Sequence, residues 1–259
     1  WCRVAGQTHR LPAWRLLARG GARVAVIGAG AKYLEHWLWG DEVRGFAVEP
    51  ATDMLARVMP EVLKERPDMV VLAIHQGWLP EDTRGVNEIP VIVERFPEID
   101  LILGGHTHRP IAGTRLGHKT WYVQAGQHAE VLAVVRAKLD LARRAVVDIT
   151  SVLVPAGTDV AADKAAALAA QPWLREADAF ARRPVAELAR DVPATGKPGE
   201  DCAVSELFCQ AIAAATGADV VLHGRLGSVG LTAGRVTEGD LFGIVPYENT
   251  IALAQLTRA

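Results

Sequence analysis

The sequence has few cysteines, no long apolar run and no excess of basic charge, and each absence excludes a class of protein. Only three of the 259 residues are cysteine, and no two of them form a Cys-x-x-Cys pair. A disulfide framework or a cysteine-rich zinc site is therefore not expected. The formal net charge is -2 and the basic residues form no stripe, so the sequence does not have the pattern of a nucleic-acid-binding protein.

Membrane-spanning and signal segments are also lacking. No apolar run reaches the ~20 residues that a membrane-spanning helix requires. No signal peptide is visible. The chain starts at Trp1 instead of methionine, within a polar stretch, so we read it as a segment of a longer protein. Nothing in the sequence indicates an oligomeric state.

The first half of the chain alternates short apolar runs with segments of helical spacing, which is typical of a layered α/β domain. The predicted buried strands lie at residues 22–27, 69–74 and 100–103, and the predicted helices at 51–65 and 89–96. Further strands are predicted at residues 121–124, 129–140 and 145–154, the last two as a hairpin around 141–144.

The second half has a different composition. Residues 159–188 are rich in Ala, Arg, Asp and Glu, and we read them as a connecting helical segment. A helix is predicted at 205–216 with Ser205 as its N-cap and Gly217 as its stop, and a strand at 219–222. Cys202 and Cys209 either form a disulfide or pack on one helix, and packing is the simpler interpretation.

Three of the eight histidines come just after predicted strands. His75 directly follows the strand at 69–74, and His106 and His108 follow the strand at 100–103 after two glycines. In open α/β sheets the carboxyl ends of the strands form the ligand crevice, so we expect the three imidazoles on one rim. A single histidine there is usually a polar loop residue. The run Gly-Gly-His-x-His is more specific and indicates a metal site, because histidine is the commonest side-chain ligand for zinc and similar ions.

The segments around these histidines resemble a known family. DLILGGHTHRP is similar to the Gly-His-x-His signature of calcineurin-like metallophosphoesterases, and more narrowly of the 5'-nucleotidase family. VVLAIHQG resembles the strand of that family that ends in a ligand histidine, and VQAGQHAEVLAVV resembles the strands that close its catalytic domain. The segment from ATGADVVLHG to NTIALAQLT resembles the opening half of its C-terminal substrate-binding domain.

The resemblance implies an α/β fold with two domains. Residues 1–157 are expected to form part of a four-layer α/β/β/α metallophosphoesterase domain, and residues 158–190 a linker helix. Residues 191–259 are expected to form an incomplete α/β substrate-binding domain of the 5'-nucleotidase type. A periplasmic or extracellular location is implied on the same ground.

The resemblance also implies the chemistry. His75 and His106 match ligands of one divalent metal ion, and His108 matches a ligand of a second; zinc, manganese or a similar ion is expected. Paired metals ~3.5–4 Å apart activate a water and stabilise the attacking and leaving oxygens of an in-line displacement. The expected activity is hydrolysis of a small-molecule nucleotide or other phosphoester, of the 5'-nucleotidase or 2',3'-cyclic-nucleotide phosphodiesterase type.

Two residues are expected to bind the substrate. Tyr247 takes the place of a phenylalanine that stacks on the nucleobase in the family, and an aromatic ring there is suited to stacking. Simple packing of Tyr247 is the alternative interpretation. Arg225, or alternatively Lys197, is expected to offer positive charge to the phosphate in place of the arginine that the family uses.

Other motifs of the family have no counterpart in the sequence. Its Asp-x-His, Gly-Asp and Gly-Asn-His motifs are absent upstream of Arg23. Three neutral imidazoles do not supply the anionic oxygen that bridges two divalent cations. We therefore expect this chain by itself to bind metals poorly and to be inactive, with the catalytic histidine of the family outside it.

Three other interpretations remain open. A dinucleotide-binding oxidoreductase is suggested by Gly28 and Gly30 after a strand and by Glu49 about 20 residues on, but Tyr33 occupies the third glycine position. The chain could also come from a degenerate phosphoesterase that serves as a non-catalytic scaffold. A thiosulfonate-ester hydrolase on the same framework is the third.

Overall fold

The computed structural model describes residues 2–4, 7–9, 11–33, 47–80, 85–157, 160–197, 200–224, 227–247 and 250–256. The chain divides into two compact units, Trp1–Val160 and Ala161–Ala259. The first unit opens with the antiparallel strands β1 (Cys2–Val4) and β2 (Gln7–His9).

The first unit is built on a six-stranded sheet in the order β3-β4-β5-β6-β8-β7. Its strands are β3 (Trp14–Arg19), β4 (Ala22–Ala29), β5 (Met69–Ile74), β6 (Leu101–Leu103), β7 (Pro110–Leu116) and β8 (Thr120–Ala125). The four inner strands β4, β5, β6 and β8 are parallel, and β3 and β7 are antiparallel edges. The loops that follow β5, β6 and β8 therefore open on the same rim of the sheet.

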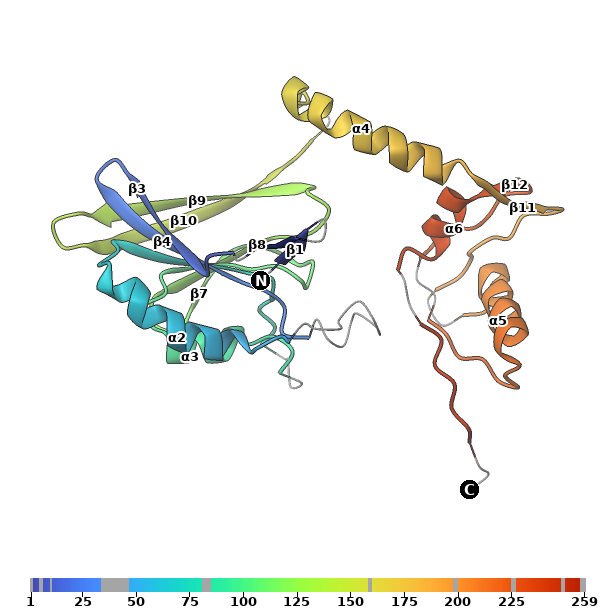
Figure 1. Ribbon diagram of the computed structural model, residues 1–259, viewed down its shortest axis with the longest axis horizontal. Coiled ribbons are helices and arrows are strands. Elements are labelled where there is room, and N and C mark those ends of the chain that lie inside the picture. Colours follow the sequence, from blue (N-terminus) through green and yellow to red (C-terminus); the bar gives the residue numbers. More distant parts are fainter. Residues whose placement is uncertain are drawn as a thin grey trace. The chain divides into compact units, whose positions relative to one another are not determined.

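Two helices cover one face of this sheet, α2 (Ala51–Lys64) and α3 (Ile89–Arg95) (Figure 1). The buried positions of α2 recur at helical spacing, with Leu55, Val58 and Val62 facing the sheet. They pack in one core with Ile27 of β4 and Leu72 of β5. An amphipathic stripe on a buried sheet face is the arrangement that the apolar spacing predicts.

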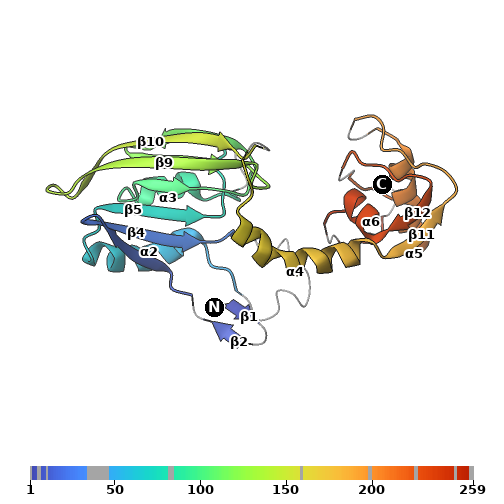
Figure 2. The same ribbon diagram turned by 90° about the horizontal axis from the view of Figure 1, so that it is seen from above.

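A long hairpin covers the other face of the sheet (Figure 2). It is formed by the antiparallel strands β9 (Val131–Asp140) and β10 (Ala145–Pro155). Ile149 of β10 packs with Val71, Leu101 and Val123 of the sheet in a second core. The predicted α/β architecture is confirmed. The described residues of this unit form three layers, helices, sheet and hairpin, and no helix among them lies outside the hairpin.

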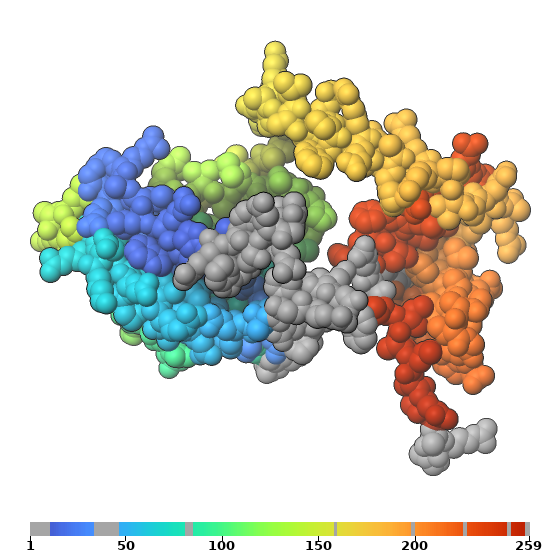
Figure 3. Space-filling view, in the orientation of Figure 1, coloured from blue at the N-terminus to red at the C-terminus, as the bar shows by residue number. Residues whose placement is uncertain are grey.

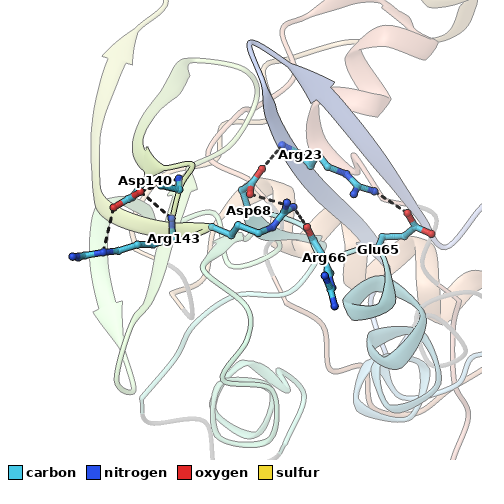
Figure 4. A network of polar contacts seen from close by, with 8 residues as sticks. Arg23, Glu65, Arg66, Asp68, Asp140 and Arg143 are labelled. Atoms are coloured by element: carbon cyan, nitrogen blue, oxygen red, sulfur yellow. Dashed lines mark hydrogen bonds and ion pairs between the residues drawn. The ribbon is translucent and has the colours of Figure 1, made fainter.

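A buried carboxylate ties the sheet to the tip of the hairpin (Figure 4). Asp68 precedes β5, and its carboxylate accepts a hydrogen bond of 2.7 Å from the Arg23 amide and lies 3.3 Å from the Arg144 guanidinium. Arg144 also donates to the backbone carbonyl of Arg66. A second ion pair of 2.8 Å joins Arg23 to Glu65 at the end of α2. Asp68 therefore links β4, β5 and the β9–β10 turn.

We predict that Asp68→Ala lowers the free energy of unfolding of this unit by about 2 kcal/mol, since it leaves the partly buried Arg23 amide without its acceptor. Chemical denaturation measures the effect. Arg143→Ala is the control, because the Arg143 side chain is 86% exposed and its ion pair with Asp140 is 3.7 Å long. Exposed pairs of this kind contribute about 0–1 kcal/mol. Equal losses in the two variants would contradict the prediction.

The second unit contains three helices and a short sheet among its described residues. They are α4 (Lys164–Ala181), β11 (Pro184–Leu188), α5 (Ala203–Thr216), β12 (Gly234–Thr237) and α6 (Glu238–Ile244). β11 and β12 pair antiparallel. Leu231, Val236 and Ile244 form a small core. Helix α4, yellow in Figure 3, has no buried residue along its length.

Several predictions for the second unit need correction. Helix α5 begins two residues before the predicted start, and its N-cap is Cys202, whose sulfur accepts from the Ser205 amide. Gly217 ends the helix in the left-handed conformation, as predicted. The strand predicted at 219–222 is wrong: residues 219 and 220 form a bend, residues 221 and 222 are irregular, and the Leu222 side chain is 93% exposed. A short apolar run needs a neighbouring strand to become part of a sheet.

The remaining expectations for this half are partly met. The predicted connecting segment at 159–188 contains α4 and then β11. Cys202 and Cys209 are free thiols, so packing is the correct interpretation. The assignment of residues 1–157, 158–190 and 191–259 to catalytic, linker and substrate domains stays a prediction. Among the described helices, none is both long and apolar enough to cross a bilayer.

Candidate functional site

Two of the predicted histidines lie side by side at the carboxyl rim of the sheet. His75 directly follows β5, and His106 follows the parallel neighbour β6 after two glycines. Their ring centroids are 5.6 Å apart, with 58° between the ring planes. His106 is half-buried, whereas His75 and His108 are exposed. The parallel pairing of β5 and β6 is what brings together residues 31 positions apart in the chain.

The spacing of the His75–His106 pair fits two ligands of one ion. A zinc–nitrogen bond of about 2.0–2.1 Å puts the metal about 3.2 Å from a ring centroid, so two imidazoles at a tetrahedral angle have centroids about 5.2 Å apart. The observed 5.6 Å is close to that value. Among the described residues, however, no group of three or more His, Cys, Asp or Glu side chains is placed to hold an ion. The described residues therefore fit part of a metal site and do not complete it.

The electrostatics favour the form of His106 that binds a metal. Burial lowers the pKa of His106, and the neighbouring imidazoles of His75 and His108 lower it further. The ring is therefore neutral at neutral pH. Metal binding requires a deprotonated ligand, so His106 offers a lone pair without first releasing a proton.

The glycines before and after these histidines allow the loops to approach closely. A Cβ atom on Gly104 would collide with the ring of Tyr122, and a Cβ atom on Gly77 would collide with the side chain of Thr107. His106 and His108 themselves adopt left-handed φ values of 71° and 57°. Such values are uncommon for residues other than glycine, and they cluster at functional sites.

A buried polar network lies beneath the loop that carries His75. The backbone carbonyl of Gln76 accepts from the Gly105 amide at 3.0 Å and so joins the β5 and β6 loops. The Gln76 side chain accepts from the Glu88 amide at 2.6 Å and donates to the Glu88 carboxylate at 2.9 Å. Asn87 accepts from the Gly77 amide at 2.7 Å. Gln76, Asn87 and Glu88 are all buried, so these contacts hold the loop in one conformation.

Glu88 is the centre of this network. Besides Gln76, its carboxylate accepts from the Ala51 amide at 2.9 Å and from both the amide and the hydroxyl of Thr52 at 3.2 and 2.9 Å. Burial opposes the charged form, but these hydrogen bonds outweigh it and hold the pKa of Glu88 below its ordinary value of 4.5. The carboxylate therefore joins the first turn of α2 to the loop after His75.

A second buried network supports the loop of His106 and His108. Burial raises the pKa of Tyr122 to about 12, so its hydroxyl stays protonated and donates to Gln124 at 2.7 Å. The Gln124 amide in turn donates to the Thr107 hydroxyl at 3.0 Å and to the Arg109 carbonyl at 2.8 Å. Thr107 is thus fixed between the two histidines.

A fourth histidine lies at this rim and was not predicted. His128 follows β8, and its ring centroid is 6.3 Å from that of His108, at an interplanar angle of 59°. The signal was present in the sequence, because His128 comes after a predicted strand and Gly126, just as the other histidines follow strands and glycines.

The predicted substrate-binding residues belong to the second unit. Tyr247 follows α6, and its side chain is 60% exposed, so a face of the ring is open to solvent. Arg225 lies outside the described residues. The loop before it contains His223, whose ring packs edge-on against Phe208 with centroids 5.2 Å apart.

The structure does not favour the dinucleotide-binding interpretation. Gly28 lies inside β4 and pairs with Ala73 of β5. A dinucleotide fingerprint needs its glycines in the turn between strand and helix. Of the two glycines, Gly28 and Gly30, only Gly30 lies beyond the end of the strand.

Comparisons with known proteins found a matching family model and similar solved structures. Residues 180–257 match the family model of the 5'-nucleotidase C-terminal domain. No curated protein sequence matches the chain. A structure described as a 5'-nucleotidase from Staphylococcus aureus, in complex with α-ketoglutarate, is 21% identical with a TM-score of 0.70, over 92% of this chain and 48% of the other.

Two further solved structures are similar. The sulfate thiohydrolase SoxB from Thermus thermophilus is 21% identical with a TM-score of 0.64, over 92% of this chain and 42% of the other. The calcineurin-like phosphoesterase YfkN from Bacillus subtilis is 15% identical with a TM-score of 0.55, over 67% of this chain and 60% of the other.

These likenesses show a fold shared with 5'-nucleotidases and calcineurin-like phosphoesterases, and the family model identifies the same family in the C-terminal part of the chain. The resemblance seen in the sequence is therefore confirmed. The chain spans about half the length of the first two of these structures.

Proposed function

We propose that this chain carries part of the metal-dependent active site of a phosphoester hydrolase of the 5'-nucleotidase type. The observation that carries the proposal is the His75–His106 pair, 5.6 Å apart at the carboxyl rim of the sheet. In this proposal His75 and His106 ligate one divalent ion, zinc or manganese, and His108 ligates a second. The fold and the family model support the reaction class.

In this proposal the described residues hold the metal ions and keep the ligand loops in position. Two divalent ions, when bound, supply a hydroxide at neutral pH and Lewis-acid stabilisation of the phosphoryl oxygens. The neutral ring of His106 provides a ready ligand. The networks around Glu88 and Gln124 fix the two ligand loops, and such outer partners typically change metal affinity or activity 10–100-fold when they are removed, an order-of-magnitude guide.

The proposed substrate is a nucleotide, either a nucleoside monophosphate or a 2',3'-cyclic nucleotide. Tyr247 would stack on the base, since its ring is largely exposed, and Arg225 would face the phosphate. On the family resemblance alone, we propose a periplasmic or extracellular location.

Hydrolysis of a thiosulfonate ester is a second candidate. The likeness to the sulfate thiohydrolase, with a TM-score of 0.64 and 21% identity, favours it nearly as strongly as the likeness to the first nucleotidase structure favours a nucleotide. The fold is shared by both chemistries, so only a substrate comparison separates them.

The test uses the full-length product of the gene that encodes this chain. With manganese or zinc present, AMP, 2',3'-cyclic AMP and a thiosulfonate ester are offered in parallel. We expect phosphate release from a nucleotide that stops when EDTA removes the metal. Turnover of the thiosulfonate ester alone would establish the second candidate. No turnover of any substrate would support the non-catalytic scaffold and contradict the proposal.

A further inference from the structure

The loop of His128 belongs to the same rim as the three predicted histidines. β8 pairs in parallel with β6, so the loop after β8 opens beside the loop of His106 and His108. The two loops touch: a Cβ atom on Gly126 would lie 3.9 Å from the carbonyl oxygen of His108. The position of His128 at the site is therefore set by the sheet.

His128 occupies a strained corner of a tight turn. The Glu130 amide donates to the Gln127 carbonyl at 3.2 Å, which closes a turn over residues 127–130. His128 and Ala129, its two central residues, have φ values of 55° and 56°. Turns with two left-handed corners normally use glycine, asparagine or aspartate there. The Glu130 carbonyl, which accepts from Ala156 at 2.8 Å, anchors the turn to the end of β10. Held strain of this kind marks functional sites.

The distance between His108 and His128 fits an oxygen atom and not a metal ion. Two imidazoles on one zinc ion have centroids about 5.2 Å apart at a tetrahedral angle, and the observed 6.3 Å is wider. An oxygen that accepts a hydrogen bond of about 2.8 Å from each ring lies about 3.9 Å from each centroid. With a centroid separation of 6.3 Å, the angle at the oxygen is then about 108°, which suits an oxygen lone-pair arrangement.

The ring of His128 is also available. Its side chain is exposed, and among the described residues no hydrogen bond of its imidazole is found. It is therefore not used to stabilise the turn. In the part of the chain that the structure describes, its ring contact is with His108, 6.3 Å away, so a ligand oxygen at the rim would meet both imidazoles.

We infer that His128 contacts the substrate, and that it and the ring nitrogen of His108 that is not on the metal hold one oxygen of the substrate's anionic tetrahedral group between their rings. The inference rests on the proposed function and adds a substrate-binding residue to it. A phosphate and the sulfonate end of a thiosulfonate present the same oxygen, so both reaction types could use this contact.

The experiment follows the histidine ring signals of the full-length product of the gene that encodes this chain by NMR, with zinc alone and then with inorganic phosphate. We expect zinc to shift the signals of His75, His106 and His108, and phosphate to shift those of His128 only once zinc is bound. His128→Gly removes the imidazole while suiting the left-handed backbone. It should weaken phosphate binding about tenfold or more, the loss expected for a hydrogen bond to a charged group, and leave zinc affinity unchanged.

Ala129→Gly is the matched control, because it relaxes the same turn and keeps the imidazole. Equal phosphate affinity in His128→Gly and the parent chain overturns the inference, and so does an equal loss in both glycine variants. A loss of zinc affinity in His128→Gly would identify His128 as a metal ligand, and that result would also overturn the inference. If the parent chain binds no zinc at His75 and His106, the proposed function fails together with it. Thiosulfate in place of phosphate shows which anion the pair prefers.

Discussion

His106→Ala should lower the zinc affinity of the full-length product of the gene that encodes this chain by about 100-fold or more, since removing even an outer partner of a metal ligand costs about 10–100-fold. The side chain is half-buried, its pKa is lowered by burial and by the neighbouring imidazoles, and its ring centroid is 5.6 Å from that of His75. No other side chain in the described residues offers His75 a similar partner ring. Isothermal titration calorimetry at neutral pH measures the loss.

His118→Ala is the control for this prediction. His118 is exposed in the turn between β7 and β8, at the amino end of β8 and therefore at the opposite rim of the sheet. Its removal should leave the rim site and its zinc affinity intact. If the His118 and His106 variants lose zinc affinity equally, zinc binds nonspecifically to surface histidines, and the assignment of the zinc site to the rim of the sheet is wrong.

Glu88→Ala is expected to have the largest effect on stability, a loss of about 3–4 kcal/mol in the free energy of unfolding, because four buried donors lose their acceptor. The donors are the Ala51 amide, the amide and hydroxyl of Thr52, and the Gln76 side chain. The same change should loosen the loop that follows His75. Glu94→Ala on the same helix is the control, since Glu94 is exposed and its loss should cost no more than about 0.5 kcal/mol.

The pH dependence provides an independent check on Glu88. Its pKa in the folded state lies below the ordinary value of 4.5, so the unfolded state takes up the proton first as the pH falls. The stabilisation from Glu88 is therefore complete above about pH 4.5 and is lost as the pH falls toward the folded-state pKa. Glu88→Gln should show a flatter loss of stability in this acidic range. Identical slopes for the parent chain and Glu88→Gln would contradict the assignment.

The inner strands could be predicted because they are buried on both faces. β5 is a continuous apolar run and its predicted bounds are correct. The edge strands β3 and β7 lack that signal. β7 begins at Pro110, contains Gly113 and has an irregular register between Ile111 and Thr114. Edge strands tolerate proline and bulges, so their sequences do not read as strands.

The site was predictable where it follows strand ends and unpredictable where it depends on tertiary packing. His75 and His106 were predicted from the two strands that they follow. Glu88 contacts Ala51, which lies 37 positions earlier in the chain, and Gln76, which lies 12 positions earlier. No local sequence pattern marks a buried carboxylate that binds the first turn of another helix. The turn of His128 was missed because histidine and alanine are not the residues that usually form left-handed corners.

The most direct test of the central claim is anomalous diffraction at the zinc edge from crystals of the full-length product of the gene that encodes this chain, grown with zinc. We predict a peak about 2.0–2.1 Å from a ring nitrogen of both His75 and His106, and no such peak at this position in crystals of His106→Ala. A chain that binds zinc in solution but shows its anomalous peaks only away from these two rings would contradict the assignment of the rim as a metal site.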